Sequence, residues 1–391
     1  MDKNIKIASW SLLAVGILII GVFFLFSFND GYTIFGENFI EYDKTGQVGD
    51  FIGGIVGTIF ALLGTILIYL NFREQVLQNK KEGFETIFLQ LLTIQRDNVN
   101  QLNYTTSNST EFSTAKDRKV FKVIFTEFLQ CYREVKKFSN SINPEDYLTK
   151  KNQKFLENLI KKNSLKESVI ELAIIDIAYN IVYFGLSEDG QIILRHRFQK
   201  RYKDLYFYPL LNYMKLKPKK EFVERWEKWE LLLSYDFKRF QETCRELYDY
   251  NPNTTKNLSV DLKNIVYSTE FDKYYNGHQH RLGHYFRHLF QTVKYINYND
   301  DIKEEEKYFY AKTLRAQLST YEQAILFINS ITTLGYKWEL LPEENLLKKG
   351  DDKIKCKLIT NNQLIKNLPG YHLSGVTYKS FYPDIIYEFD D

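Results

Sequence analysis

The sequence has few cysteines and few prolines. Only 3 cysteines and 7 prolines occur among its 391 residues. The cysteines, Cys131, Cys244 and Cys356, are odd in number and far apart, which excludes a disulfide framework and a paired-cysteine metal motif. We interpret them as thiols of a protein in a reducing compartment. Because proline interrupts helices, its scarcity permits long ones.

Neither sign of charge dominates, and common catalytic signatures are missing. With 52 Lys and Arg against 49 Asp and Glu, the net charge of +3 does not indicate nucleic-acid binding by itself. The sequence lacks the phosphate-binding loop GxxxxGK[ST], the dinucleotide fingerprint GxGxxG, the GxSxG nucleophile elbow and the zinc motif HExxH. These absences argue against the familiar nucleotide-dependent enzymes, serine hydrolases and zinc proteases.

Charge is absent from two long apolar stretches near the N-terminus. Residues 7–28 (IASWSLLAVGILIIGVFFLFSF) and 51–72 (FIGGIVGTIFALLGTILIYLNF) contain no charged side chain. A helix needs roughly 20 such residues to cross a bilayer, and its backbone groups must be satisfied within the segment. We therefore expect two transmembrane helices. A cleaved signal peptide is the alternative for the first run, but its apolar region is too long and no small-residue cleavage site follows.

Basic residues flank the two expected spans on one side. They precede the first span and follow the second: Lys3, Lys6, Arg73, Lys80 and Lys81. The connecting loop, residues 29–50, is acidic and contains Lys44 as its single basic residue. Because lysine and arginine are retained on the cytoplasmic side, we expect both termini in the cytoplasm and the acidic loop outside.

Small residues recur at every fourth position along the second expected span. They are Gly49, Gly53, Gly57 and Ala61. On an α-helix this spacing forms a smooth stripe that another helix can approach closely. The stripe could pack against the first span, join second spans of two chains, or line a pore. The pore is the weakest reading because Thr58 and Thr65 are the only hydroxyls deep in the span. Besides the lipid bilayer, we expect a second copy of the chain as a partner.

Beyond residue 73 the sequence is typical of a helical domain. Apolar residues recur at steps of three and four in residues 84–94, 120–138, 165–184, 221–248, 285–296 and 304–334. The polar residues 103–113 are predicted to form a loop, and residues 354–358 and 380–389 are predicted to form short strands. The predicted class is mainly α, with two N-terminal transmembrane helices, a cytoplasmic helical domain and a few short C-terminal strands. We expect an anchor at 1–72, the helical domain at 73–334 and an extension packed on it at 335–391.

The boundaries and pairing of two neighbouring helices near the C-terminus can be predicted in more detail. Asp301 followed by Glu304 fits an N-terminal capping pattern. Apolar residues then continue as one seam from Tyr310 to Ile328. The short turn NYNDD before this seam predicts an antiparallel pair with the preceding helix.

The densest group of reactive side chains is HQHRLGHYFRHLF, residues 278–290, which holds four of the 6 histidines. On a helix, His280, His284 and His288 share a face, a spacing that suits a metal ion. The segment contains no cysteine or carboxylate, however, and three ligands on one straight helix lie too far apart. We therefore expect neither a metal nor another cofactor.

Arg281 and His288 also share a face of this expected helix. Six residues separate them, the longest spacing in the Arg-x(4–6)-His pattern, so the segment resembles that motif of the all-helical HEPN-type ribonucleases. That resemblance implies His288 as acid or base and Arg281 as stabiliser of phosphate charge. In the structural alternative, these side chains pair with polar groups at the end of a core helix. Basic residues at 154–163 and 195–203 could favour anionic lipid or RNA, but interleaved acids make solvated faces the better reading.

Five segments together resemble the putative phage abortive infection proteins, the AbiC-like family. They are GDFIGGIVGTIFALLGTILIYLNFREQ, FETIFLQLL, DIAYNIVYFG, HYFRHLFQTVKYI and LRAQLSTYEQAILFIN. They follow the family's order and extend from about residue 49 to 334, leaving 185–275 and the tail after Gly335 unmatched. The resemblance implies a bacterial anti-phage protein and carries over no catalytic residue. Its signature segments make five residues candidate ligand contacts: His284, Tyr285, Arg287, Arg315 and Gln317.

Three functional hypotheses follow. The leading one is an inner-membrane effector or sensor, whose cytoplasmic domain responds to infection and acts through the spans. Its trigger would be a phage component or RNA, and other defence proteins are expected partners. The first alternative is a membrane-tethered, metal-independent ribonuclease using Arg281 and His288, although on balance we expect no enzyme. The second is a non-catalytic scaffold that recruits another effector.

Overall fold

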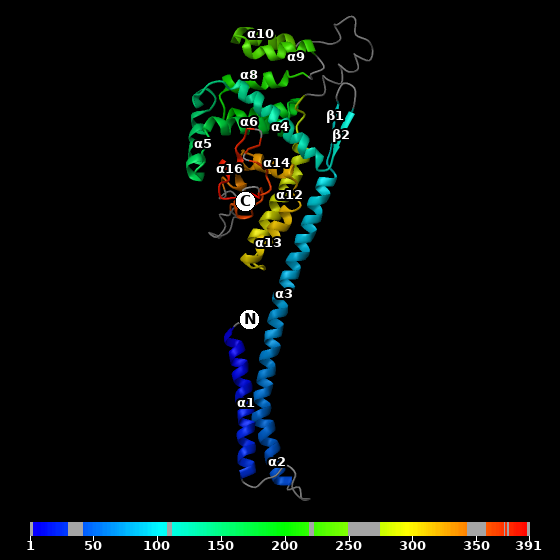
Figure 1. Ribbon diagram of the computed structural model, residues 1–391, viewed down its shortest axis with the longest axis vertical. Helices are drawn as coiled ribbons and strands as arrows, with labels where there is room; N and C mark the ends of the chain where they lie inside the picture. Colours follow the sequence, from blue (N-terminus) through cyan, green and yellow to red (C-terminus); the bar gives the residue numbers. More distant parts are fainter. Residues whose placement is uncertain are drawn as a thin grey trace. The chain divides into compact units, whose positions relative to one another are not determined.

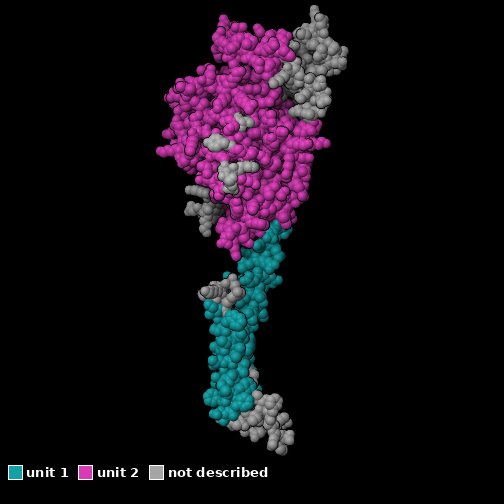
Figure 2. All heavy atoms as spheres, in the orientation of Figure 1, with its two compact units in different colours: residues 1–87 teal, residues 88–391 magenta. Residues whose placement is uncertain are grey.

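The computed structural model describes residues 3–29, 42–107, 112–218, 223–248, 274–341, 357–370, 372–373 and 375–388. Its internal contacts define two compact units, residues 1–87 and 88–391 (Figure 2). Helices dominate both (Figure 1). The predicted mainly α class is therefore confirmed, while the expected extension at 335–391 stays a prediction.

The first unit is built from two long helices. It contains α1 (Lys3–Asn29), α2 (Tyr42–Phe51), a π-helical turn η1 (Ile52–Val56) and the first part of α3 (Gly57–Asn100). Helix α1 lies beside this part of α3 (Figure 1), where a side chain at Gly16 would lie 3.3 Å from Ile59. The rings of Phe23 and Phe51 stack at 4.5 Å. Residues 42–50, expected in a loop, are therefore helical, whereas residues 30–41 of that loop lie outside the described residues.

One helical stretch among the described residues is long and apolar enough to cross a membrane. It is Gly49–Asn100, whose most apolar window has a mean hydropathy of 2.4 and only 12% of its residues buried. The described apolar part of α1, Trp10–Phe26, falls below that length. The described residues thus contain one candidate span where two were expected. The first span stays a prediction.

The small-residue stripe of the second expected span does not face α1. The π-helical turn Ile52–Val56 lies within it, and its wider turn shifts the alignment of residues four apart. Among the described residues, no atom lies within 4 Å of a Cβ added at Gly49 or Gly53, and Gly57 is exposed. Close approach to α1 occurs instead at Ile59 and Phe60. Self-association through the stripe stays a prediction.

The second unit combines a small hairpin with a bundle of helices. The end of α3 is followed by strands β1 (Asn103–Ser107) and β2 (Phe112–Lys116) and helices α4 (Lys119–Phe138), α5 (Lys150–Asn163), α6 (Val169–Phe184), α7 (Glu188–Gln199), α8 (Asp204–Lys215), α9 (Val223–Leu231), α10 (Phe237–Tyr248), α12 (Gln279–Tyr298), α13 (Glu304–Arg315), α14 (Thr320–Ser330), α15 (Leu358–Asn361) and α16 (Tyr378–Phe381). Short 3-10 turns are η2 (Pro144–Asp146), η3 (Leu232–Ser234) and η5 (Tyr336–Trp338).

Helices α6 and α14 form the centre of this unit. Every residue from Leu172 to Val182 of α6 is buried, as is every residue from Glu322 to Ser330 of α14. Helix α4 crosses α6 (Figure 1) and buries one face, including Phe121 and Phe128. Each fully buried Leu, Ile or Phe side chain contributes roughly 1.5–3 kcal/mol relative to exposure, so this layer supplies much of the driving force for folding.

The polar segment 103–113 was wrongly expected to be a loop. Its described part forms β1, which pairs antiparallel with β2 from Asn103↔Lys116 to Ser107↔Phe112. Threonines and Tyr104 suit extended backbone because branched and aromatic side chains pack well on a pleated surface. Tyr104 is buried, which anchors the hairpin to the domain.

The helix expected over residues 304–334, with its apolar seam from Tyr310 to Ile328, is divided in the structure. Helix α13 ends at Arg315, and α14 begins after Ser319. The Ser319 N–H donates to Glu322 at 2.8 Å, and the Ser319 hydroxyl accepts from the Glu322 N–H at 3.4 Å. This reciprocal capping box starts a new helix inside the apolar pattern. The predicted cap at Asp301 is also wrong, since Lys303 precedes α13.

The remaining boundary predictions differ in smaller ways. Turn η3 divides the expected helix 221–248 into α9 and α10. Within residues 380–388 the chain forms the end of α16 and turns, where a strand was expected. Of the other expected strand, residues 354–356 lie outside the described residues, and Leu358 begins α15. The aromatic residues Tyr378, Tyr382 and Tyr387 near the C-terminus are buried without belonging to a strand.

Two glycines let the chain entering α12 cross closely over the end of α6. Gly185 and Gly277 have φ angles of +78° and +82°, and a Cβ on either would lie 2.6 Å from the opposing backbone. Such angles and such an approach require glycine. The His278 N–H donates to the Tyr183 carbonyl at 2.8 Å. This crossing fixes the start of α12 and with it the histidine-rich segment.

Candidate functional site

Arg281 and His288 lie on α12 but have separate partners. The Arg281 Nε–H donates to the Asn103 carbonyl at 2.9 Å, and its guanidinium lies 4.6 Å from the Tyr104 ring centroid. His288 Nδ1 lies 2.9 Å from Gln95 Oε1 on α3. Burial lowers the pKa of His288, which favours the neutral ring. The structure does not bring the two side chains together at one site, and their catalytic role stays a prediction.

Arg281 belongs to a buried cluster that the sequence reading missed. His278 is fully buried, and its Nε2 lies 2.7 Å from Glu127 Oε2 on α4. The Tyr104 hydroxyl donates to the other Glu127 oxygen at 2.7 Å. Arg281 Nη1 lies 3.3 Å from His278 Nδ1. The cluster therefore ties the hairpin, α4 and α12 together.

Two of the signature residues hold helices in place. Tyr285 is buried and its hydroxyl donates to Glu322 of α14 at 3.1 Å. Burial and the Glu322 carboxylate raise the pKa of Tyr285. Arg315 is also buried and donates to the Gln363 carbonyl at 3.0 Å. Both contacts are structural in character.

The other signature residues are exposed. His284 and Arg287 present their side chains to solvent on α12. Gln317 is also exposed, while its carbonyl accepts from Arg118 at 2.9 Å. Within the described ranges, no group of three histidine, cysteine, aspartate or glutamate side chains could hold a metal ion. The predicted residues are thus divided between buried and exposed positions and are not gathered in one site.

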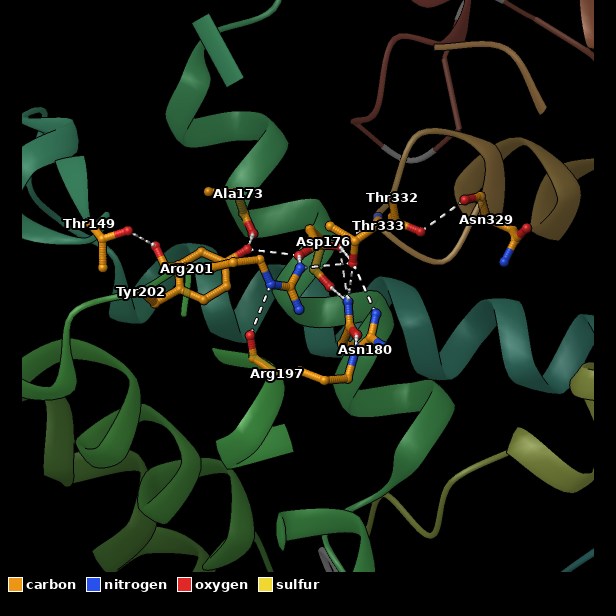
Figure 3. A network of polar contacts seen from close by, with 10 residues as sticks. All are labelled: Thr149, Ala173, Asp176, Asn180, Arg197, Arg201, Tyr202, Asn329, Thr332 and Thr333. Atoms are coloured by element: carbon orange, nitrogen blue, oxygen red, sulfur yellow. Dashed lines mark hydrogen bonds and ion pairs between the residues drawn. The ribbon is translucent and has the colours of Figure 1, made fainter. Parts of the chain in front are cut away.

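Among the described residues, a more highly connected polar site lies elsewhere and is centred on Asp176 of α6 (Figure 3). Asp176 is 2% exposed. Its Oδ1 accepts from the Thr333 N–H at 2.9 Å, the Thr333 hydroxyl at 2.7 Å and the Asn180 amide at 3.0 Å. Its Oδ2 accepts from the Tyr202 hydroxyl at 2.8 Å and Arg201 Nη1 at 2.5 Å. Five donors therefore saturate this carboxylate.

Two arginines reach the network from the end of α7 and the turn that follows. Arg197 and Arg201 are four residues apart, so their side chains share one side of the chain. The Arg201 Nε–H donates to the Arg197 carbonyl at 3.0 Å, and Nη1 donates to the Thr333 hydroxyl at 2.8 Å. The Arg197 Nε–H donates to Asn180 Oδ1 at 3.1 Å. Figure 3 shows both guanidinium groups directed toward Thr333 and Asn180.

Neighbouring elements set the position of these arginines. Ser187 caps the start of α7 by accepting from the Gly190 N–H at 3.3 Å. At the other end, the Thr149 N–H donates to the Arg201 carbonyl at 3.0 Å, which attaches the start of α5 to the turn after α7. We call Asp176, Asn180, Arg197, Arg201, Tyr202 and Thr333 the Asp176 network. It joins α6, α7 and the turn after α14.

The electrostatics of the two arginines differ. Burial alone would lower the pKa of Arg201, but Asp176 together with Tyr202 and Tyr336 outweighs it, and the pKa is raised. Burial lowers the pKa of Arg197, and the nearby Arg201 cation lowers it further. Asp176 thus neutralises Arg201 more fully than Arg197. The network contains two cations for one anion.

Two buried donor groups of this region have no hydrogen-bond partner among the described residues. They are Arg201 Nη2 and the hydroxyl of Tyr336. Burial raises the pKa of Tyr336, and Asp176 and Arg201 also affect it, so this hydroxyl lies within electrostatic reach of the network. A buried polar group without a partner costs free energy, so unpaired donors of this kind require a reason.

One signal in the sequence could have identified this site. Asp176 and Asn180 interrupt an otherwise apolar stretch, and a buried carboxylate requires partners. The two arginines could not be recognised as site residues, because the basic pattern of residues 195–203 predicts a solvated face. Thr333 lies in a turn that matches no sequence motif. Its role as a donor to Asp176 is therefore visible only in the structure.

The fold and this network define a class: a helical domain with a buried carboxylate and two arginines, continuous with a strongly apolar helix. Residues 277–353 of the chain match a family model described as putative phage abortive infection protein. The predicted resemblance is confirmed by this match, whose described part includes α12, α13, α14 and Thr333. No curated protein and no solved structure matches the chain.

Proposed function

We propose that this protein is a membrane-anchored bacterial anti-phage protein, acting as an effector or sensor in abortive infection. The observation that carries the proposal is the match of residues 277–353 to the phage abortive infection model. The apolar surface of Gly49–Asn100 supports the membrane anchor. The cellular location that follows is the bacterial inner membrane, with both termini in the cytoplasm.

Helix α3 is the element through which the domain would act on the membrane. It is a single helix of 44 residues and belongs to both units. In the second unit, Gln95 of α3 contacts His288 at 2.9 Å, and the rings of Phe88 and Tyr310 lie 5.3 Å apart. Both contacts join α3 to the family-matched segment. A ligand that rearranges this segment would therefore act directly on the helix that enters the bilayer.

The effect in the cell would be a change in the membrane once infection is sensed. Association of second spans between copies, through Gly49, Gly53, Gly57 and Ala61, would change how the helices pack in lipid. A phage component or RNA would be the trigger, and other defence proteins would take part. No chemical step by the domain is required.

A plaque assay combined with a potential-sensitive dye tests this proposal. Bacteria expressing the protein should resist phage and lose membrane potential after infection. Gly53→Leu with Gly57→Leu should abolish protection because the bulkier side chains block close helix approach. Gly83→Leu is the matched control, because Gly83 lies on the same helix outside the expected span and also has no described atom within 4 Å of an added Cβ.

A protective response with unchanged membrane potential would refute action through the membrane. His288→Ala separates this proposal from a ribonuclease that needs the imidazole. Protection should persist in that variant if the spans carry the function. Loss of protection with His288→Ala, with expression and membrane association retained, would instead support the ribonuclease alternative.

A further inference from the structure

The Asp176 network has one more positive than negative charge. Asp176 is the only carboxylate among the described residues that affects the pKa of either arginine, and its ion pair is with Arg201. Its oxygens already accept five hydrogen bonds. Because a buried cation without a counterion is unfavourable, the partly buried Arg197 favours an additional anion.

The two buried groups without a partner near this charge can both donate a hydrogen bond. Arg201 Nη2 can only donate a hydrogen bond, and the Tyr336 hydroxyl is able to donate one. Arg197 is half-buried, so part of its side chain is accessible to solvent. A ligand that satisfies all three must accept several hydrogen bonds and carry negative charge.

We propose that the Asp176 network binds the phosphate group of a small molecule. Arg197 meets the group at the surface, and Arg201 Nη2 and the Tyr336 hydroxyl donate to its inner oxygens. A phosphate supplies several acceptor oxygens in a compact group, and guanidinium forks match its geometry. Because two of the three donors are buried, a small anion or a terminal phosphate fits this site, and the backbone of a nucleic-acid strand does not. This inference concerns the ligand and does not depend on the role in defence.

Thermal unfolding of the full-length protein in detergent, with inorganic phosphate as the probe, tests the proposal. A ligand bound only by the folded state raises the unfolding temperature as its concentration rises. Potassium chloride at equal ionic strength controls for screening. We expect phosphate to raise the unfolding temperature of the wild-type protein and chloride to have no comparable effect.

Arg197→Gln should weaken phosphate binding by about tenfold or more, because it removes a charge-assisted contact. The Arg201–Asp176 pair remains intact in that variant. Arg195→Gln is the matched control. Arg195 is exposed on the same helix, and its guanidinium lies 5.7 Å from the Tyr208 ring, away from the network. Its removal should leave the affinity within about twofold of the wild type.

Tyr336→Phe separates a binding role from a structural one. Without phosphate, this variant should be as stable as the wild type or more stable, because it removes an unpaired buried hydroxyl. With phosphate, its affinity should fall several-fold. Loss of stability without phosphate and unchanged affinity would overturn the assignment of this hydroxyl to the ligand.

A second arm identifies the source of the phosphate group. Tighter binding of a mononucleotide than of inorganic phosphate would support an organic phosphate, and equal binding would support recognition of the phosphate group alone. The proposal is overturned if phosphate and chloride have the same effect on the wild type. It is also overturned if Arg195→Gln and Arg197→Gln weaken binding equally, because that result indicates general charge attraction.

Discussion

Helices α3 and α6 both contain long apolar stretches, but the stretch in α6 is buried in the protein and the stretch in α3 is largely exposed. In α6, every residue from Leu172 to Val182 is buried. In the apolar part of α3, Ile68 and Phe72 are 71% and 65% exposed. A helix apolar on all sides needs either a protein core or a lipid environment. The polar residues Asp176 and Asn180 mark α6 as a core helix, because each has partners that only a protein interior supplies.

The largest expected effect comes from removing the polar centre of the core helix. Asp176→Ala leaves Arg201 and Tyr202 without their acceptor and should lower the free energy of unfolding by about 3–5 kcal/mol. Chemical denaturation of the full-length protein in detergent measures this change. Glu246→Ala, an exposed carboxylate on α10, should change it by no more than about 0.5 kcal/mol. Equal values for the two variants would contradict a central role for Asp176.

A second pair of variants compares the two helices directly. Ile177→Ala in α6 removes a fully buried side chain and should cost about 2–5 kcal/mol through lost burial and the cavity left behind. Ile68→Ala in α3 should change the free energy of unfolding much less, because that side chain is largely exposed within this chain. The same denaturation experiment checks both. A cost at Ile68 equal to that at Ile177 would indicate that another protein helix covers this face.

The smallest expected effect concerns pH. Burial lowers the pKa of His288 below its ordinary value of 6.5, so the unfolded state binds a proton more readily than the folded state. Stability contributed by the neutral ring is present above pH 6.5 and decreases as the pH falls below that value. His288→Gln should reduce the slope of unfolding temperature against pH below 6.5. Some slope should remain, because burial lowers the pKa of His280 as well.

His284→Gln is the matched control for the pH experiment. His284 lies one turn earlier on α12 and is exposed. Its replacement should leave the slope unchanged. A slope that responds equally to both substitutions would show that burial of His288 against Gln95 is not its cause.

Periodicity predicted the helices well where one apolar face decides the structure. Residues 120–138 correspond closely to α4 (Lys119–Phe138), and residues 285–296 lie within α12. It failed where local hydrogen bonds override the pattern. Ser319 and Glu322 start a new helix inside a continuous apolar seam, and β1 forms from a segment rich in threonine.

The candidate site was less predictable than the fold. Arg281 and His288 were predicted to act together because they share a face of one helix, yet Arg281 binds the hairpin and His288 binds α3. Arg197 and Arg201 were not predicted as site residues, because a basic run on a helix is usually solvated. Their partners, Asp176 and Thr333, are 157 residues apart in the sequence, and no local pattern joins them.

The amino-acid sequence by itself determined the helical class, the apolar character of α3 and the resemblance to phage abortive infection proteins. These properties follow from composition and from patterns within single segments, where the spacing of side chains along one helix is sufficient. Only the tertiary structure decided that Asp176 receives five hydrogen bonds from α6, the turn after α7 and the turn after α14. The reason is physical: the charge balance of a buried site depends on which distant side chains are close in space, and packing alone sets that proximity.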